Sequence, residues 1–283
     1  MNVFIAGASG MVALRVIDFL PKKWNLYTPG HSELNITDKN ALDTYFADKD
    51  LDAIINFAAV TDVDGAEKER EDENGVCWQV NVNGTVNLAT LAKKKKALMI
   101  QISTDAVFDG QKGPYTESDK PADSLEDVGW YGWTKRMAEK KLAEIGTDLT
   151  IVRIIFPTGN FANPKDYLNK IKGGLEKGYG MFTDQASSPT YIPDLAKALT
   201  TIVEKKKTGI YHVATHPVTT TYEIACAIAQ KFDLGEVKKG LLSEYLKNEG
   251  IAKRPIKGGL LCDETQKELG LTFASLNEVL ATF

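Results

Sequence analysis

Short apolar runs alternate with segments of helical periodicity along the first half of the chain, and this alternation constrains the fold more than any other feature. Apolar runs that predict strands lie at residues 2–6, 25–27, 53–56, 97–102 and 149–155. Segments with helical spacing of apolar residues lie at 11–20, 38–47, 79–93 and 130–145. Because short apolar strands joined by helices form βαβ units, we expect an α/β fold with a doubly wound parallel sheet covered on both faces.

The pattern becomes irregular after Phe156, which indicates a second structural unit. Residues 173–180 and 238–257 are rich in Gly and Lys, unlike the apolar runs of the first half. We predict that a smaller lobe lies over the carboxyl edge of the sheet. The sheet domain is expected to comprise residues 1–156 and 191–220, and the lobe residues 157–190 and 221–283.

Charge and hydropathy exclude several classes of protein. The 283 residues include 34 Lys and Arg against 38 Asp and Glu, a net charge of −4, so the chain lacks the basic excess typical of nucleic-acid binding. No apolar stretch reaches the roughly 18 residues that a membrane span needs. The N-terminal segment also lacks the basic start of a secretory signal.

Neither the cysteines nor the acidic residues form a pattern typical of a metal site. Cys77, Cys226 and Cys262 are far apart and form no CxxC pair, which favours reduced thiols in a cytoplasmic protein over disulfides or zinc ligation. The acidic stretch 62–73 is a charge run rather than a convergent set of oxygens. We therefore expect it to be a solvated surface and expect no metal site.

A glycine turn follows the first predicted strand. Gly7, Gly10 and Ala13 have the spacing GxxGxxA between that strand and the helix at 11–20. Gly7 permits a tight turn, and Gly10 lets backbone amides at the start of the helix approach a pyrophosphate. The turn therefore predicts a Rossmann-like domain that binds NAD or NADP.

The position that selects between these two cofactors carries no charged residue. A residue that binds the adenosine ribose is expected about 20 residues after the glycines, at the end of the second strand. Residues 27–32 read Tyr-Thr-Pro-Gly-His-Ser and contain neither an acid nor an Arg. We therefore expect either NADPH or NADH to serve.

Tyr131 and Lys135 are one helical turn apart and share a face of the helix at 130–145. A neighbouring ammonium favours the phenolate and so lowers the pKa of a tyrosine, which suits it to proton transfer at neutral pH. Thr104 follows the fourth strand, and ligands bind at the carboxyl ends of strands in this fold. Its hydroxyl is expected to bind a substrate carbonyl oxygen.

Together these motifs resemble the extended short-chain dehydrogenase/reductase family, and within it the dTDP-4-dehydrorhamnose reductases. The resemblance runs nearly from end to end of the chain. The segments that carry it are 34–38 (LNITD), 56–64 (NFAAVTDVD), 81–85 (NVNGT), 103–110 (STDAVFDG), 114–117 (PYTE), 131–135 (YGWTK), 184–185 (DQ), 189–190 (PT), 209–212 (GIYH) and 254–255 (RP).

The resemblance implies a reaction and a set of site residues. Thr104, Tyr131 and Lys135 would form a catalytic triad, in which Tyr131 protonates O4 of a nucleotide-linked 4-keto-6-deoxy sugar while NADPH or NADH delivers hydride to C4. The cofactor would contact Gly7, Ser9, Gly10, Met11, Val12, Asn35, Ile36, Ala58, Ala59, Thr61, Tyr131 and Lys135. The sugar nucleotide would contact Thr61, Val63, Thr104, Asp105, Tyr131, Phe156 and Arg254. The lobe would then bind substrate, and because family members are often dimers, a homodimer is one expected arrangement.

Two other functions fit the same motifs. A sugar-nucleotide epimerase has the same triad with a tightly held NAD, and the regulatory β subunit of methionine adenosyltransferase resembles this family while acting as a partner protein. The sequence departs from the family pattern mainly around the substrate, where Ala106 and Phe156 stand in place of a common Tyr and Trp. The intact set of Thr104, Tyr131 and Lys135 favours an enzyme.

Overall fold

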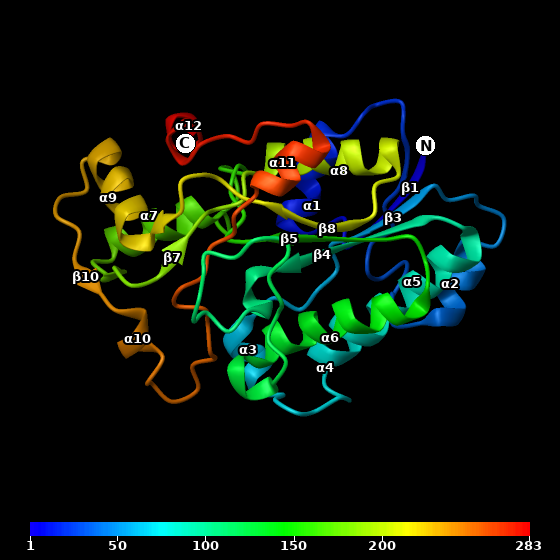
Figure 1. Ribbon diagram of the computed structural model, residues 1–283, viewed down its shortest axis with the longest axis horizontal. Coiled ribbons are helices and arrows are strands. Elements are labelled where there is room, and N and C mark those ends of the chain that lie inside the picture. Colours follow the sequence, from blue (N-terminus) through cyan, green and yellow to red (C-terminus); the bar gives the residue numbers. More distant parts are fainter.

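Six parallel strands form the central sheet of the computed structural model, which describes residues 1–283 (Figure 1). The strands are β1 (Asn2–Ala6), β2 (Asn25–Tyr27), β3 (Ala53–Asn56), β4 (Leu98–Thr104), β5 (Leu149–Ile154) and β8 (Gly209–Val213). Their order in the sheet is β2-β1-β3-β4-β5-β8. The expected α/β fold is therefore confirmed, and β8 returns to the sheet from beyond the irregular part of the chain.

Helices cover both faces of the sheet. One face carries α1 (Met11–Phe19), α8 (Ile192–Lys205) and α11 (Asp263–Leu269) (Figure 1). The other carries α2 (Lys39–Tyr45), α3 (Val63–Glu67), α4 (Val76–Trp78), α5 (Thr85–Lys95) and α6 (Trp130–Ile145). No helix has the combination of length and apolar character that crossing a membrane requires.

Strand side chains alternate between two apolar cores, one on each face of the sheet. In β1, Val3 and Ile5 belong to the core shared with α1 and α8. Phe4 and Ala6 belong to the core shared with α2 and α5. Because both faces are buried, the strands have continuous apolar runs in the sequence rather than an alternating pattern.

The winding direction of the chain reverses between β1 and β3, which are neighbours in the sheet. From β1 the chain moves to β2 on one side, and from β3 onward it builds the sheet on the other side. Loops that leave β1 and β3 at their carboxyl ends therefore diverge and leave a crevice, which is the usual ligand site in such folds.

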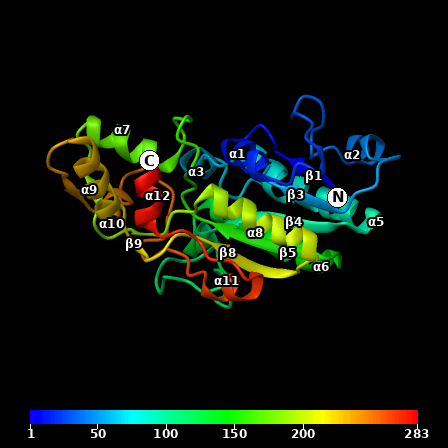
Figure 2. The same ribbon diagram turned by 90° about the horizontal axis from the view of Figure 1, so that it is seen from above.

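A smaller lobe lies beyond the carboxyl ends of the strands (Figures 1 and 2). Its elements are α7 (Tyr167–Glu176), β6 (Met181–Phe182), β7 (Ala186–Ser187), β9 (Thr219–Thr220), α9 (Thr221–Phe232), β10 (Lys239–Gly240), α10 (Leu242–Tyr245) and α12 (Leu276–Thr282). Leu168, Ile224 and Val279 belong to a separate apolar core that joins α7, α9 and α12. The lobe therefore has its own packing and faces the crevice from the side.

The predicted helix at 79–93 differs from the observed one. Helical backbone begins at α4, passes through the π-helical segment η1 (Gln79–Gly84) and continues as α5. Within η1 the Asn81 side chain accepts a bond from Val60 N at 2.8 Å and donates to Val60 O at 3.2 Å. The apolar periodicity of the sequence does not reveal a π-helical turn. Such turns are frequent near functional sites.

Candidate active site

The glycine turn joins β1 to α1 at the crevice. Gly7 has φ +74°, and a Cβ there would lie 2.5 Å from the backbone nitrogen of Ala58. Gly7 is therefore required by its backbone conformation and by its contact with the segment after β3. Gly10 is the N-cap of α1, has extended backbone and supplies no side-chain cap. The first amides of α1 are thus left available to an anion.

A cavity of about 470 Å³ opens beside this turn, at the carboxyl ends of β1, β3, β4 and β5. Most of the predicted site residues line it together. They are Gly10, Met11, Val12, Ala59, Thr61, Val63, Thr104, Asp105, Tyr131, Lys135, Phe156 and Arg254. The structure therefore brings the residues predicted for the substrate, and most of those predicted for the cofactor, into one site.

Five predicted cofactor residues lie outside this lining. Gly7 and Ala58 pack against each other beneath the turn, and Ser9 is exposed within it. Ile36 is buried and contacts the position of Gly84. Asn35 Oδ1 accepts a hydrogen bond from Thr37 N at 3.0 Å. The contact of Asn35 and Ile36 with an adenine stays a prediction.

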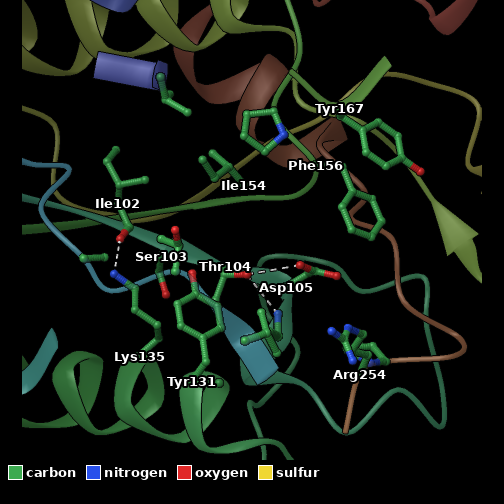
Figure 3. Close-up of a pocket in the computed structure, with 18 of the residues that line it drawn as sticks. Ile102, Ser103, Thr104, Asp105, Tyr131, Lys135, Ile154, Phe156, Tyr167 and Arg254 are labelled. Atoms are coloured by element: carbon green, nitrogen blue, oxygen red, sulfur yellow. Dashed lines mark hydrogen bonds between the residues drawn. The ribbon is translucent and has the colours of Figure 1, made fainter. Parts of the chain in front are cut away.

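The predicted catalytic residues converge from two elements (Figure 3). Tyr131 and Lys135 extend from the first turns of α6 toward the end of β4, where Thr104 is the last residue. Lys135 Nζ donates to the carbonyl oxygen of Ile102 at 2.7 Å. Thr104 Oγ1 donates to Asp105 Oδ1 at 3.2 Å and accepts from the Ala106 amide at 3.2 Å.

The protonation of Tyr131 differs from the expectation based on sequence. Burial, and next the negative charge of Asp105, raise the pKa of Tyr131 above its usual value, while the Thr104 hydroxyl acts in the opposite direction. The predicted lowering of the Tyr131 pKa is therefore wrong for this arrangement, because desolvation of the buried phenol is the largest effect on it. The Lys135 ammonium donates to Ile102 O, and burial lowers its own pKa to about 8. Tyr131 keeps its proton at neutral pH, as a general acid must.

Asp105 is the acidic residue of the cavity. It follows Thr104 in the short 3₁₀ helix η2 (Asp105–Val107) and is 9% exposed. Burial raises its pKa to about 7, because desolvation outweighs the bonds from Thr104 and from backbone amides. The carboxyl group of Asp105 therefore titrates near neutral pH.

An aromatic pair forms the wall of the cavity on the side of the lobe (Figure 3). The rings of Phe156 and Tyr167 stack with centroids 4.5 Å apart and an angle of 7° between their planes. Phe156 has φ +43°, an uncommon conformation for a bulky residue. The Tyr167 hydroxyl lies 3.3 Å from Ser187 Oγ and 3.2 Å from Thr221 Oγ1, so this ring is held within the lobe.

Basic side chains surround the entrance. Lys165, Lys170, Lys253 and Arg254 line the cavity in addition to Lys135, against the single carboxylate of Asp105. Arg254 is also bonded to Asp64, and Lys253 Nζ donates to Glu126 O. A site with this excess of positive charge is suited to an anionic ligand, although the chain as a whole is acidic.

Sequence reasoning missed several lining residues, among them Tyr167, Lys165, Lys170 and Gln185. All four belong to the irregular region after Phe156. Gln185 lies in a segment that carries the family resemblance, although no contact was predicted for it, and no motif or periodicity marks the other three. Asn81 was also missed as the residue that holds Val60 in the loop after β3. Nowhere in the structure do three or more His, Cys, Asp or Glu side chains gather as a metal site.

A doubly wound sheet with a glycine turn at its switch point, and with a Tyr–Lys pair facing the end of β4, defines a dinucleotide-binding protein of the short-chain dehydrogenase/reductase class. The family model described as the RmlD substrate binding domain matches residues 1–283. The chain belongs to this family.

Individual relatives agree with this assignment. The chain is 30% identical to a dTDP-4-dehydrorhamnose reductase of Aggregatibacter actinomycetemcomitans, over 95% of this chain and 94% of that protein. It is 29% identical to methionine adenosyltransferase 2 subunit beta of Rattus norvegicus, over 82% of this chain and 72% of that protein. A crystal structure of dTDP-4-dehydrorhamnose reductase from Bacillus anthracis in complex with NADP superposes with a TM-score of 0.87 at 26% identity, covering 100% of this chain and 98% of that one.

Proposed function

We propose that this protein is an NAD(P)H-dependent reductase that converts the 4-keto group of a nucleotide-linked 6-deoxy sugar to a hydroxyl. The observation that carries the proposal is one shared cavity, lined both by Thr104, Tyr131 and Lys135 and by the start of α1. Membership of the RmlD family supports the same class of reaction.

The residues around α1 fit a dinucleotide. Gly10 is exposed, and a Cβ added there would meet only the Gly7 carbonyl oxygen, at 3.2 Å. A glycine is therefore not demanded by packing at this position, but it leaves room for a phosphate against the amides of Met11 and Val12. Ala59 and Thr61 would flank the nicotinamide ribose, and Lys135 would hold its hydroxyls. When bound, the reduced nicotinamide supplies a hydride to C4.

The protein's own side chains would handle the proton and the orientation of the keto group. The Tyr131 hydroxyl donates its proton to O4 as negative charge develops there, and the Thr104 hydroxyl donates a hydrogen bond to the same oxygen. Because its pKa is raised, Tyr131 remains protonated at neutral pH and can donate this proton once negative charge develops on O4. The Lys135 ammonium, one helical turn from Tyr131, would offset part of the negative charge that Tyr131 then carries, although burial and Asp105 have the larger effect on the pKa of Tyr131.

The rest of the cavity would recognise the sugar nucleotide. Thr61, Val63, Asp105 and Phe156 would border the sugar, since they line the same cavity as Tyr131. The basic residues at the entrance, Arg254 among them, suit the diphosphate that joins sugar to nucleoside. In this proposal the sheet domain binds the cofactor and the lobe completes the substrate site. The predicted bounds of the lobe, 157–190 and 221–283, need one correction: α11 packs on the sheet, because Cys262 and Leu269 belong to the core shared with α1 and α8, so only the remainder of 221–283 belongs to the lobe beside residues 1–156 and 191–220.

The decisive experiment is a panel of nucleotide-linked 4-keto sugars, each assayed with NADPH and with NADH by the loss of nicotinamide absorbance. We expect turnover with at least one 6-deoxy-4-keto sugar. Because β2 is followed by neither an acid nor an Arg, the two cofactors should differ by no more than about tenfold, or about 1.4 kcal/mol. Absence of turnover across the panel, with cofactor binding intact, would refute the reductase.

The similarity to methionine adenosyltransferase 2 subunit beta favours a second candidate, a regulatory subunit. Co-purification with a methionine adenosyltransferase, together with no turnover in the panel, would support it. Purified protein that retains oxidised NAD at one equivalent per chain and interconverts sugar epimers would instead support an epimerase.

A further inference from the structure

The face of α6 that carries Tyr131 and Lys135 continues for one more turn to Glu139. Lys135 Nζ donates to Ile102 O at 2.7 Å, and Ser103 Oγ donates to Glu139 Oε1 at 2.6 Å. Two successive turns of α6 therefore hold two successive residues of β4, directly before Thr104.

A row of polar side chains crosses the sheet beneath this face of α6. Ser103 on β4 is in register with Arg153 on β5, which is in register with His212 on β8. Arg153 donates to both carboxylate oxygens of Glu139, from Nε at 3.1 Å and from Nη2 at 2.9 Å. The side chains of Arg153 and Glu139 are 1% and 3% exposed, so the ion pair is sealed from water.

Glu139 is the one anion in this cluster. Burial, and next the charge of Arg153, lower the pKa of His212 to about 3, so the imidazole is neutral. Its Nδ1 donates to Leu261 O at 3.0 Å and its Nε2 lies 3.4 Å from Arg153 Nη1. Without Glu139, the Arg153 guanidinium would be a buried cation with no anionic partner, and Lys135 would lose the nearby negative charge that favours its protonated form.

We propose that Glu139 is a positioning residue that keeps Lys135 charged and held beside Thr104. The negative charge of Glu139 raises the pKa of Lys135 against the stronger effect of burial. The other ionisable groups around Lys135 are Tyr131 on α6, Cys77 on α4 and Asp105 in η2. The catalytic role of Lys135 rests on the proposed function, whereas its charge coupling to Glu139 does not.

The test is a pH titration of Lys135 in the full-length protein, followed by NMR of ¹⁵N-labelled lysine side chains, with Lys135→Met to assign the signal. In Glu139→Gln the midpoint should move to lower pH by about one pH unit or more. In Arg153→Met, which removes the competing cation, it should move to higher pH. Ser103→Ala is the matched control, because it removes the bond to Glu139 without changing a charge, and its midpoint should equal that of the wild type.

The double variant Glu139→Gln/Arg153→Met leaves no buried unpaired charge and guards against misfolding of the single variants. Its midpoint should lie between those of Glu139→Gln and the wild type. A midpoint at or above the wild-type value, in either Glu139→Gln or the double variant, would overturn the proposal.

Turnover provides a separate readout. The loss of kcat at alkaline pH should begin at lower pH in Glu139→Gln than in the wild type, because Lys135 loses its proton earlier. If the NMR midpoints follow the expected order while no 4-keto sugar is reduced, the proposed function fails and the coupling stands. If turnover is present and the midpoints do not move, the coupling fails alone.

Discussion

Arg254 Nη2 donates to Asp64 Oδ2 at 2.6 Å and so joins two residues that are 190 positions apart in the chain. Asp64 Oδ1 also accepts from the Ala252 amide at 2.9 Å. The hydrogen bond from Arg254 is the main cause that lowers the pKa of Asp64. These bonds fasten the segment that carries Lys253 and Arg254 to α3, at the edge of the cavity.

Asp64→Asn should therefore loosen the substrate side of the site. We expect the KM for the sugar nucleotide to rise several-fold while the Kd for NADPH is unchanged. Because the pair is partly exposed, the free energy of unfolding should fall by no more than about 1 kcal/mol. Steady-state kinetics and urea unfolding measure both. Glu244→Gln, in an exposed ion pair with Lys247, is the control, and an equal rise in KM there would contradict the assignment.

The two glycines of the turn should respond differently to substitution. Gly10→Val places a branched side chain where a phosphate would approach, so NADPH affinity should collapse while the fold persists. Gly7→Ala meets a positive φ and the Ala58 backbone, so it should lower the free energy of unfolding by roughly 1–3 kcal/mol. Calorimetry and thermal unfolding separate these effects. Unchanged NADPH binding in Gly10→Val would rule out the pyrophosphate position.

Tyr131→Phe keeps the ring but removes the proton of the proposed general acid. The kcat should fall by roughly 10²–10⁴-fold, with NADPH binding and stability retained. Tyr45→Phe makes the same chemical change on α2, where the ring packs edge-on against Phe46, and should leave kcat unaltered. A Tyr131→Phe enzyme with more than about half of the wild-type kcat, when chemistry limits the rate, would exclude this mechanism.

Asp105 should make stability depend on pH. Its carboxyl group ionises near pH 7 in the folded protein and near pH ~4 in the unfolded chain, so folding retains a proton that unfolding releases. Stability from this group is therefore full below about pH 4 and is lost as the pH rises to about 7.

Asp105→Asn should accordingly be more stable than the wild type at pH 8 but not at pH 4, with a difference of roughly 1–4 kcal/mol. Urea unfolding at the two pH values measures it. Asp48→Asn, at an exposed position, should change the free energy of unfolding by the same amount at pH 4 and at pH 8. An Asp105→Asn variant with equal effects at pH 4 and pH 8 would mean that the carboxyl group is solvated.

Local patterns were sufficient for much of the framework. The strands at 2–6, 25–27 and 53–56 and the helix at 130–145 have the predicted bounds, because apolar periodicity and turn residues act over short stretches of chain. The spacing of Tyr131 and Lys135 predicted that they share one helix face. Gly7 predicted a tight turn, and its φ is positive in the structure. The alternation of strands and helices along the chain also predicted that the strands of the sheet run parallel.

Only the tertiary structure determined the protonation of the site residues and the wall of the cavity that Phe156 and Tyr167 form. The pKa of Tyr131 depends on burial and on Asp105, neither of which the i, i+4 spacing with Lys135 encodes. The stack of Phe156 on Tyr167 joins the sheet domain to the lobe, and no motif marks it. Glu139 meets Arg153 only because α6 crosses the strand that carries Arg153. Burial and contacts between distant segments arise when the elements pack, so the sequence determined the elements and the reacting groups, and packing determined their environment.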